Sequence, residues 1–121
     1  MQGEAQLDRE WLMSLCSAGT EFLKDLLGLF RTQAHAYVRT LHSASELSGN
    51  SAVGDLTHKL KGSASSLGLR KLAEMAQVFE RDVRSGELPH RELKKRAEAL
   101  MEAIVAGESA VEHYIEEIEK R

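Results

Sequence analysis

The sequence contains few of the residues that build disulfide-rich, metal-bound or strand-rich proteins. Of its 121 residues one is cysteine and one is proline, and aromatic residues make up 5%. The lone Cys16 excludes an internal disulfide bond and argues against a cysteine-based metal site. Hydrophobic residues still make up 42% of the chain, which favours aliphatic helix packing over a sheet. A single domain spanning residues 1–121 is long enough to bury a core.

Long apolar runs and long runs of one charge are also missing. No segment reaches the roughly 18 apolar residues that span a bilayer. Sixteen basic and 19 acidic side chains are spread along the chain, which argues against a nucleic-acid surface. The start Met1-Gln2-Gly3-Glu4 lacks the layout of a signal peptide. We therefore expect a cytoplasmic protein without membrane contact, either standing alone or as one domain of a larger membrane-bound kinase.

Hydrophobic residues recur at helical spacing through most of the chain. The pattern predicts helices at about residues 8–17, 21–47, 51–67, 69–85 and 90–120, with Asp8 as the first N-cap and Gly68 ending the third helix. Four long amphipathic helices with short connections predict an all-α protein. The architecture that buries their stripes most simply is an antiparallel up-and-down four-helix bundle, with the short N-terminal helix covering one end.

The second predicted helix has apolar residues on more than one side. We expect its core-facing stripe to contain Phe22, Leu26, Leu29, Phe30, Tyr37 and Leu41. A second group lies about 100° further round the helix and predicts a docking face for a partner. It consists of Leu27, Arg31, Ala34 and Val38. The alternative is that Leu27 and Val38 pack against the first or the last helix.

The third predicted helix sets a histidine opposite its apolar stripe. At 100° per residue, the stripe lies on one side and His58 on the other, so the imidazole is expected to be exposed. The stripe contains Val53, Leu56, Leu60, Ala64 and Leu67, and the polar neighbours of His58 are Gly54, Asp55, Lys61, Gly62 and Ser65.

These neighbours suit phosphoryl transfer. An exposed imidazole is largely neutral at cytoplasmic pH, so one ring nitrogen of His58 can act as a nucleophile. Lys61 offers a positive charge to a phosphoryl group attached there. Glycine inside a helix costs about 1 kcal/mol relative to alanine, and room for an approaching partner is a reason to keep Gly62.

The segment Thr57-His58-Lys59-Leu60-Lys61-Gly62-Ser63 resembles the central motif of histidine-containing phosphotransfer (HPt) domains. Those domains commonly show His-x-Leu-Lys-Gly-Ser, small residues, Leu-Gly, and a helix ending near Leu-Glu. Here the continuation contains Leu67-Gly68-Leu69 and Phe79-Glu80. Phe79 stands where leucine is usual, and Leu69 where a small residue is frequent, departures that affect packing and not chemistry.

The resemblance implies a phosphocarrier that transfers a phosphoryl group in either direction between a receiver-domain aspartate and Nε2 of His58. Lys61 would hold the phosphoryl group and Gly62 would admit the receiver, while Asp55, Lys59 and Ser65 would contact it. The implied partners are a response-regulator receiver domain and a hybrid sensor histidine kinase. The receiver would bring the Mg²⁺, so we expect no cofactor or metal on this chain and no enzymatic activity of its own.

Three other functions are compatible with parts of the pattern. A phosphoacceptor domain of a chemotaxis-type histidine kinase would share the bundle and the exposed histidine, with a kinase domain as donor. A helical interaction module without phosphotransfer would leave Gly62 unexplained. A hydrolase using His58 as a base oriented by Asp55 would need a concave pocket, which a convex helix face does not offer. We expect a monomer, because the stripes are buried within one chain.

Overall fold

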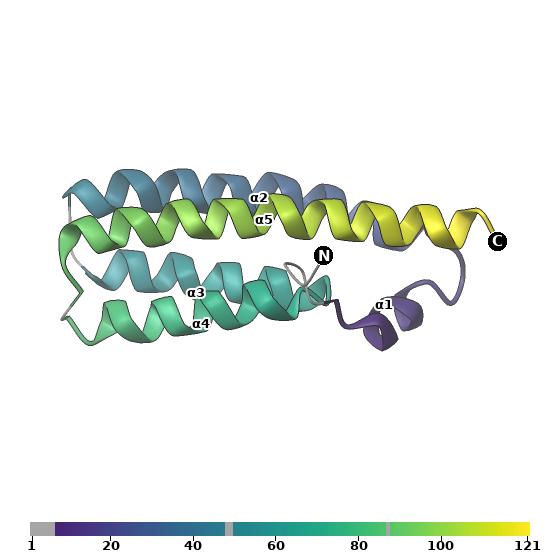
Figure 1. Ribbon diagram of the computed structural model, residues 1–121, viewed down its shortest axis with the longest axis horizontal. Helices are drawn as coiled ribbons and strands as arrows, with labels where there is room; N and C mark the ends of the chain where they lie inside the picture. Colours follow the sequence, from purple (N-terminus) through teal and green to yellow (C-terminus); the bar gives the residue numbers. More distant parts are fainter. Residues whose placement is uncertain (1–6, 48–49, 87) are drawn as a thin grey trace.

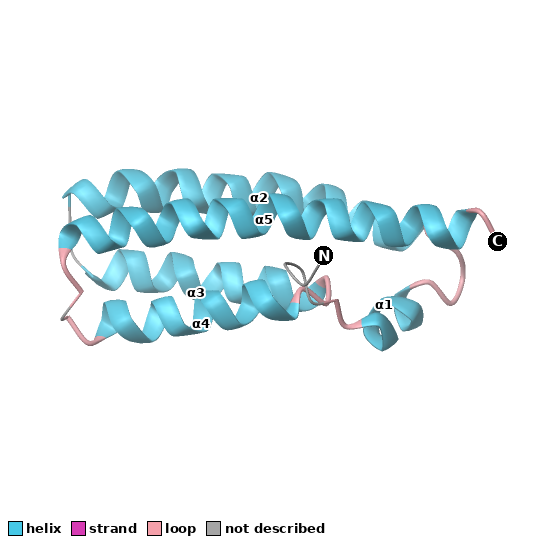
Figure 2. Ribbon diagram, in the orientation of Figure 1, coloured by secondary structure: helices cyan, strands magenta, loops and turns pink. Residues whose placement is uncertain are grey.

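The computed structural model describes residues 7–47, 50–86 and 88–121. In these ranges the chain forms helices joined by short loops (Figure 2). The pairing of Leu7 with Leu69 is an isolated antiparallel bridge. The helices are α1 (Arg9–Leu15), α2 (Glu21–Leu47), α3 (Asn50–Ser66), α4 (Arg70–Arg84) and α5 (His90–Glu119). The all-α prediction is confirmed, and each helix ends within two residues of its predicted limit. None of the described helices combines the length and apolar character that crossing a membrane requires.

The helices α2 to α5 lie side by side along the long axis of the molecule (Figure 1). Helix α2 contacts α3 and α5, and α4 likewise contacts α3 and α5. The α3–α4 seam and the α2–α5 seam therefore lie on opposite sides of the bundle. Helices α2 and α5 extend beyond the other two, and α1 packs against α2 near this free end (Figure 1).

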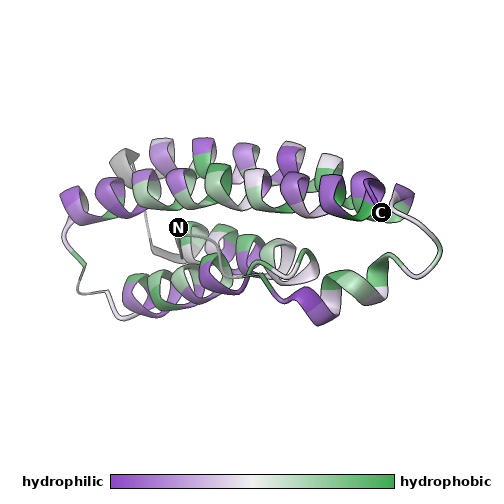
Figure 3. Ribbon diagram, turned by 45° about the vertical axis from the view of Figure 1, so that its right-hand side comes forward, coloured by the Kyte–Doolittle hydropathy of each residue, from purple (hydrophilic) through white to green (hydrophobic). Residues whose placement is uncertain are grey.

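Hydrophobic and hydrophilic residues alternate along the helices of the bundle (Figure 3), and buried hydrophobic side chains from α2 to α5 form one core cluster. The apolar stripes of α3, α4 and α5 supply most of this core. Its fully buried members include Val53, Leu60 and Ala64 of α3, Leu67 of the turn after α3, Ala76, Phe79 and Val83 of α4, and Ala97, Leu100, Ile104 and Val111 of α5.

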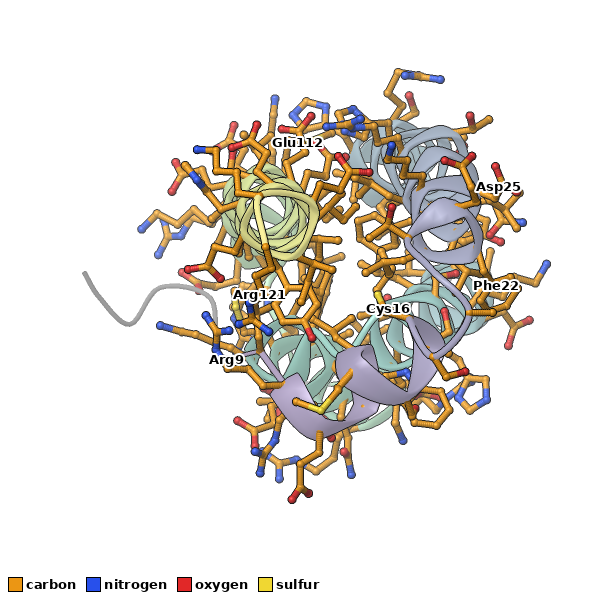
Figure 4. All side chains as sticks on the ribbon, turned by 90° about the vertical axis from the view of Figure 1, so that its right-hand side faces the viewer. Arg9, Cys16, Phe22, Asp25, Glu112 and Arg121 are labelled. Carbon is orange, nitrogen blue, oxygen red and sulfur yellow. The ribbon has the colours of Figure 1, made fainter. Side chains whose placement is uncertain are left out.

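The predicted stripe of α2 is confirmed in part. Phe30 and Leu41 are buried, and Leu26 and Tyr37 are partly buried against the core. Phe22 and Leu29 are 56% and 53% exposed, so their assignment to the core was wrong, and Phe22 points away from the bundle in the end-on view (Figure 4). The fully buried face lies further round the helix and is formed by Leu23, Leu27, Phe30, Ala34, Val38 and Leu41. These positions keep the three- and four-residue spacing of a core face along the helix, whereas the stripe through Phe22 and Leu29 meets the polar Gln33.

The turn between α3 and α4 is closed by Gly68, as predicted. Gly68 has φ +68°, and the N–H of Leu69 donates to the carbonyl of Ala64 (3.0 Å), the hydrogen-bond pattern of a Schellman motif. The N-terminal segment is tied to this turn, because the N–H of Asp8 donates to the carbonyl of Gly68 (2.8 Å). Asp8 is also the predicted N-cap of α1 and accepts from the N–H of Trp11 at 3.1 Å. The relative positions of α3 and α4 are therefore fixed at one end.

Helix α5 passes close to this turn through a glycine. A Cβ placed at Gly107 would lie 2.9 Å from Cδ1 of Leu69.

The next residue, Glu108, lies in the apolar stripe and is only 8% exposed. Its Oε2 is 2.7 Å from Nε2 of His35, so this buried carboxylate has a polar partner on α2.

Candidate functional site

The packing of α3 turns His58 toward solvent. Leu60 and Thr57 are fully buried, and the Thr57 hydroxyl donates to the carbonyl of Val53 (2.7 Å), so its polarity is satisfied within the helix. The side chain of His58, on the opposite face, is 66% exposed. This is the orientation that the apolar spacing predicts.

A carboxylate on α4 is hydrogen-bonded to the imidazole. Nδ1 of His58 lies 3.2 Å from Oε1 of Glu80, whose side chain is only 16% exposed. The other oxygen, Oε2, accepts from Nε of Arg84 at 2.9 Å. Burial acts to raise the pKa of the Glu80 carboxyl, but the hydrogen bonds from Arg84 and His58 outweigh it and hold that pKa below its usual range.

The ionised carboxylate decides which ring nitrogen carries the proton. A carboxylate can only accept a hydrogen bond, so Nδ1 of His58 must be the donor. In a neutral imidazole the lone pair is then on Nε2. Nε2 has no hydrogen-bond partner among the residues that the structure describes. The arrangement therefore presents a nucleophilic nitrogen to solvent.

The imidazole opens onto a shallow groove between α3 and α4. Its volume is about 410 Å³, and it is lined by His58, Lys61, Glu74, Gln77, Val78, Glu80, Arg81 and Arg84. Lys61 thus shares the groove with His58, as its spacing of three residues predicts. Val78 is 40% exposed and adds an apolar contact point beside the cations. Three cations and two carboxylates line this groove, so its lining carries an excess of positive charge.

The two glycines near His58 have different surroundings. A Cβ added at Gly62 would meet no atom within 4 Å, so the helix surface there is open. A Cβ added at Gly54 would lie 2.9 Å from both Cζ and Nη1 of Arg84. The space at Gly62 is available to another molecule, whereas the space at Gly54 is already filled by this chain.

Three other residues predicted for the site lie in different surroundings from one another. Asp55 is exposed and accepts from Nη2 of Arg84 at 3.2 Å, so it reaches the imidazole only indirectly. Ser65 lines a different hollow, which it shares with Gly68 and the start of α4. Lys59 is exposed on α3. Their roles as partner contacts stay predictions.

The docking face predicted on α2 is wrong. Leu27, Ala34 and Val38 are 4%, 0% and 4% exposed, because they belong to the buried stripe of that helix. Arg31 pairs with Glu112 of α5 at 2.7 Å. It therefore lies on the α2–α5 seam, on the opposite side of the bundle from the groove at His58.

The sequence reasoning missed the roles of Glu80 and Arg84. A signal for Glu80 was present, because residues at equal distances from a tight turn lie opposite one another in an antiparallel helix pair. His58 is eleven residues before Leu69 and Glu80 is eleven residues after it. Arg84 follows Glu80 by four residues, which places it on the same face of α4.

The comparisons with known proteins gave a match to a family model. The family model described as Hpt domain matches residues 25–120. This range includes all of α3 and α4, and with them His58, Glu80 and the groove. No curated protein and no solved structure matches the chain. Because the family match covers most of the sequence, the chain belongs to the Hpt domain family, whose members carry out histidine phosphotransfer in phosphorelays.

Proposed function

We propose that this protein relays a phosphoryl group between receiver-domain aspartates, with His58 as the residue that carries it. The observation that supports this most directly is the hydrogen bond from Nδ1 of the exposed His58 to Glu80. It leaves the lone pair on Nε2, and His58 lines a groove that also contains Lys61. We infer a phosphocarrier without kinase or hydrolase activity of its own.

In the proposed transfer, Nε2 of His58 attacks the phosphorus of an aspartyl phosphate. The N–P bond forms as the P–O bond to the aspartate breaks, and the aspartate leaves as a carboxylate. The ring keeps its proton on Nδ1 and becomes positively charged, so the adjacent Glu80 carboxylate stabilises it. Lys61, which lines the same groove, would pair with the phosphoryl oxygens. Transfer to a second receiver is the same step in reverse.

Charge on the transferring group must also be balanced from the partner's side. We propose that the receiver contributes an acidic pocket with Mg²⁺, which would neutralise charge on the phosphoryl oxygens. Lys61 and Arg81 are two cations that line the groove at His58. They would act on the outer side of the phosphoryl group, away from the aspartate.

We place the docking surface on α3 and α4, in place of the face on α2. Gly62 leaves the helix surface open, and the exposed Val78 offers an apolar contact beside His58. Lys61, Gln77 and Arg81 form a polar rim around this contact. A receiver seated there would cover the groove and bring its aspartate to Nε2.

The proposal extends to the topology of the bundle, the oligomeric state of the protein and its location. We infer that α2 to α5 form an antiparallel up-and-down bundle in one domain, with α1 covering its free end. With the apolar stripes of all four helices facing inward, we expect a monomer. We place the protein in the cytoplasm, where a reducing environment suits the single thiol of Cys16.

Substituting Gly62 tests whether the open helix surface serves the partner. Gly62→Ala is expected to raise the free energy of unfolding by about 0.5–1 kcal/mol, because alanine is the better helix former and its methyl group meets open space. It is also expected to slow phosphoryl transfer from a receiver. Gly28→Ala is the matched control, since Gly28 is a second helical glycine with no atom within 4 Å of an added Cβ. Equal transfer rates in the two variants would contradict the role given to Gly62.

The function itself is tested with a panel of receiver domains carrying a radioactive phosphoryl group on aspartate. We expect at least one of them to transfer its label to the wild-type protein. The label should be stable in base and labile in acid, as a phosphohistidine is, and should be found on the peptide that contains His58. Base-labile label, or label on a peptide without His58, would overturn the proposal.

A second donor separates the proposal from its nearest alternative. If every receiver fails, the protein is incubated with ATP and the kinase domain of a chemotaxis-type histidine kinase. Label on His58 from the kinase alone would replace the relay by the phosphoacceptor role. No label from either donor would favour an interaction module without phosphotransfer.

A further inference from the structure

Arg84 links the two helices that form the site. Its Nε donates to Oε2 of Glu80 on α4 at 2.9 Å, and its Nη2 donates to Oδ1 of Asp55 on α3 at 3.2 Å. The guanidinium group is planar and rigid, so two anchors on different helices fix both its position and its orientation. The carboxylate that it holds is the one that receives Nδ1–H of His58.

The path of Arg84 depends on the absence of a side chain at Gly54. This glycine is buried, and a Cβ there would lie 2.9 Å from Cζ and Nη1 of Arg84 and 3.3 Å from its Cγ. Any other residue at position 54 would push the guanidinium away from Asp55. Glycine costs helix stability at this position, and the close passage of Arg84 explains why it is nevertheless present.

Glu80 needs such a restraint because its side chain is long and other cations are close. The groove also contains Lys61 on α3 and Arg81 on α4, either of which could draw the carboxylate away from the imidazole. With Oε2 held by Arg84, Oε1 stays on the side of His58. The hydrogen bond to Nδ1 then selects the tautomer whose lone pair is on Nε2.

We propose that Arg84, seated over Gly54 and anchored by Asp55, is a positioning residue that holds Glu80 against Nδ1 of His58 and so keeps the Nε2 lone pair directed at the partner. This rests on the proposed function of His58 and adds a group that touches neither the phosphoryl group nor the imidazole. Asp55 acts on His58 through Arg84 and Glu80, not directly.

The test measures the tautomer of His58 and the transfer rate in the same variants. In protein labelled with ¹⁵N-histidine, the ¹⁵N shifts of the wild type at pH 8 should show Nδ1 protonated. Arg84→Met should give a mixture of the two tautomers and slow transfer from a receiver by about tenfold. Gly54→Ala should shift the tautomers in the same direction, although it keeps every charge and introduces a better helix former.

Arg81→Met is the matched control. Arg81 lines the same groove and carries the same charge, but its ion pair is with Asp82, 3.5 Å away. Its removal should leave the tautomer unchanged. An unchanged tautomer in both Arg84→Met and Gly54→Ala would overturn the proposal, as would an equal shift in Arg81→Met. Circular dichroism and thermal unfolding of each variant establish that it is folded.

The two readouts distinguish failure of this inference from failure of the proposed function. The tautomer is measured without a receiver, so it reports on Arg84 even if no receiver transfers label. A wild-type protein that takes up label, with no tautomer change in the variants, would leave the relay intact and remove Arg84 from it.

Discussion

Replacing His58 by glutamine is expected to abolish uptake of label from every receiver that labels the wild-type protein. The lone pair of a glutamine amide nitrogen is delocalised into its carbonyl group, so it cannot attack phosphorus. The side chain at position 58 is 66% exposed and lies opposite the buried stripe. The substitution should therefore change the free energy of unfolding by no more than about 0.5 kcal/mol. The measurement is a time course of label on each protein, with thermal unfolding as a check on folding.

His113→Gln provides the control for this experiment. The side chain of His113 is 82% exposed and, like that of His58, has Nδ1 near a glutamate, 3.7 Å from Oε1 of Glu116. It lies on α5, away from the groove, and its replacement should leave the time course unchanged. Label that persists in His58→Gln, or that disappears in His113→Gln, would show that another residue accepts the phosphoryl group.

The largest loss of stability is expected from Phe79→Ala, at about 3–5 kcal/mol. Phe79 is 2% exposed in the core, and the guanidinium of Arg96 lies over its ring at 5.8 Å from the centroid. Truncation leaves a cavity directly beside Glu80, the next residue along α4. Urea unfolding followed by circular dichroism measures the change in the free energy of unfolding.

Phe79→Leu separates the volume of the ring from its aromatic character. Leucine is the residue usual at this position in the HPt motif, and it refills most of the cavity. The expected cost is about 1–1.5 kcal/mol, including the contact with Arg96. A cost equal to that of Phe79→Ala would contradict the view that phenylalanine here is a packing variant of leucine.

Much of this fold can be predicted from local sequence signals. Apolar residues recur at helical spacing along α4, and those on its inner face are all buried: Leu69, Leu72, Ala76, Phe79 and Val83. Gly68 and Asp8 mark a helix end and a helix start through chemistry that depends only on their immediate neighbours. The exposure of His58 follows from the same periodicity.

The phase of α2 could not be predicted in the same way. Its first half contains Phe22, Leu23, Leu26, Leu27, Leu29 and Phe30, which at 100° per residue spread over a broad arc of about 160°. Phe22 and Leu29 lie at one edge of this arc and Leu27 at the other, and the residues further along the helix determine which edge is buried. Ala34 and Val38 continue the edge that contains Leu27, and both are buried. Packing against α3 and α5 along the whole length selects the face that stays apolar throughout.

The surroundings of His58 were predicted only where they lie on its own helix. Lys61 and Gly62 are within one turn, so periodicity alone places them. Glu80 is 22 residues away, and its contact with His58 depends on the register between α3 and α4. The helical spacing of α3 predicts Asp55 beside His58. The carboxylate that contacts the ring comes instead from α4, because the Asp55 carboxylate accepts a hydrogen bond from Arg84.

The hairpin of α3 and α4 has a consequence for how this protein can change over evolutionary time. Gly54, Asp55, His58, Lys61, Glu80 and Arg84 all lie within one continuous stretch of 31 residues. A single recombination event that exchanges residues 54–84 would therefore carry the whole reactive unit into a related chain. Helices α2 and α5 need to preserve only their inner faces, so their outer surfaces are free to drift without disturbing the chemistry.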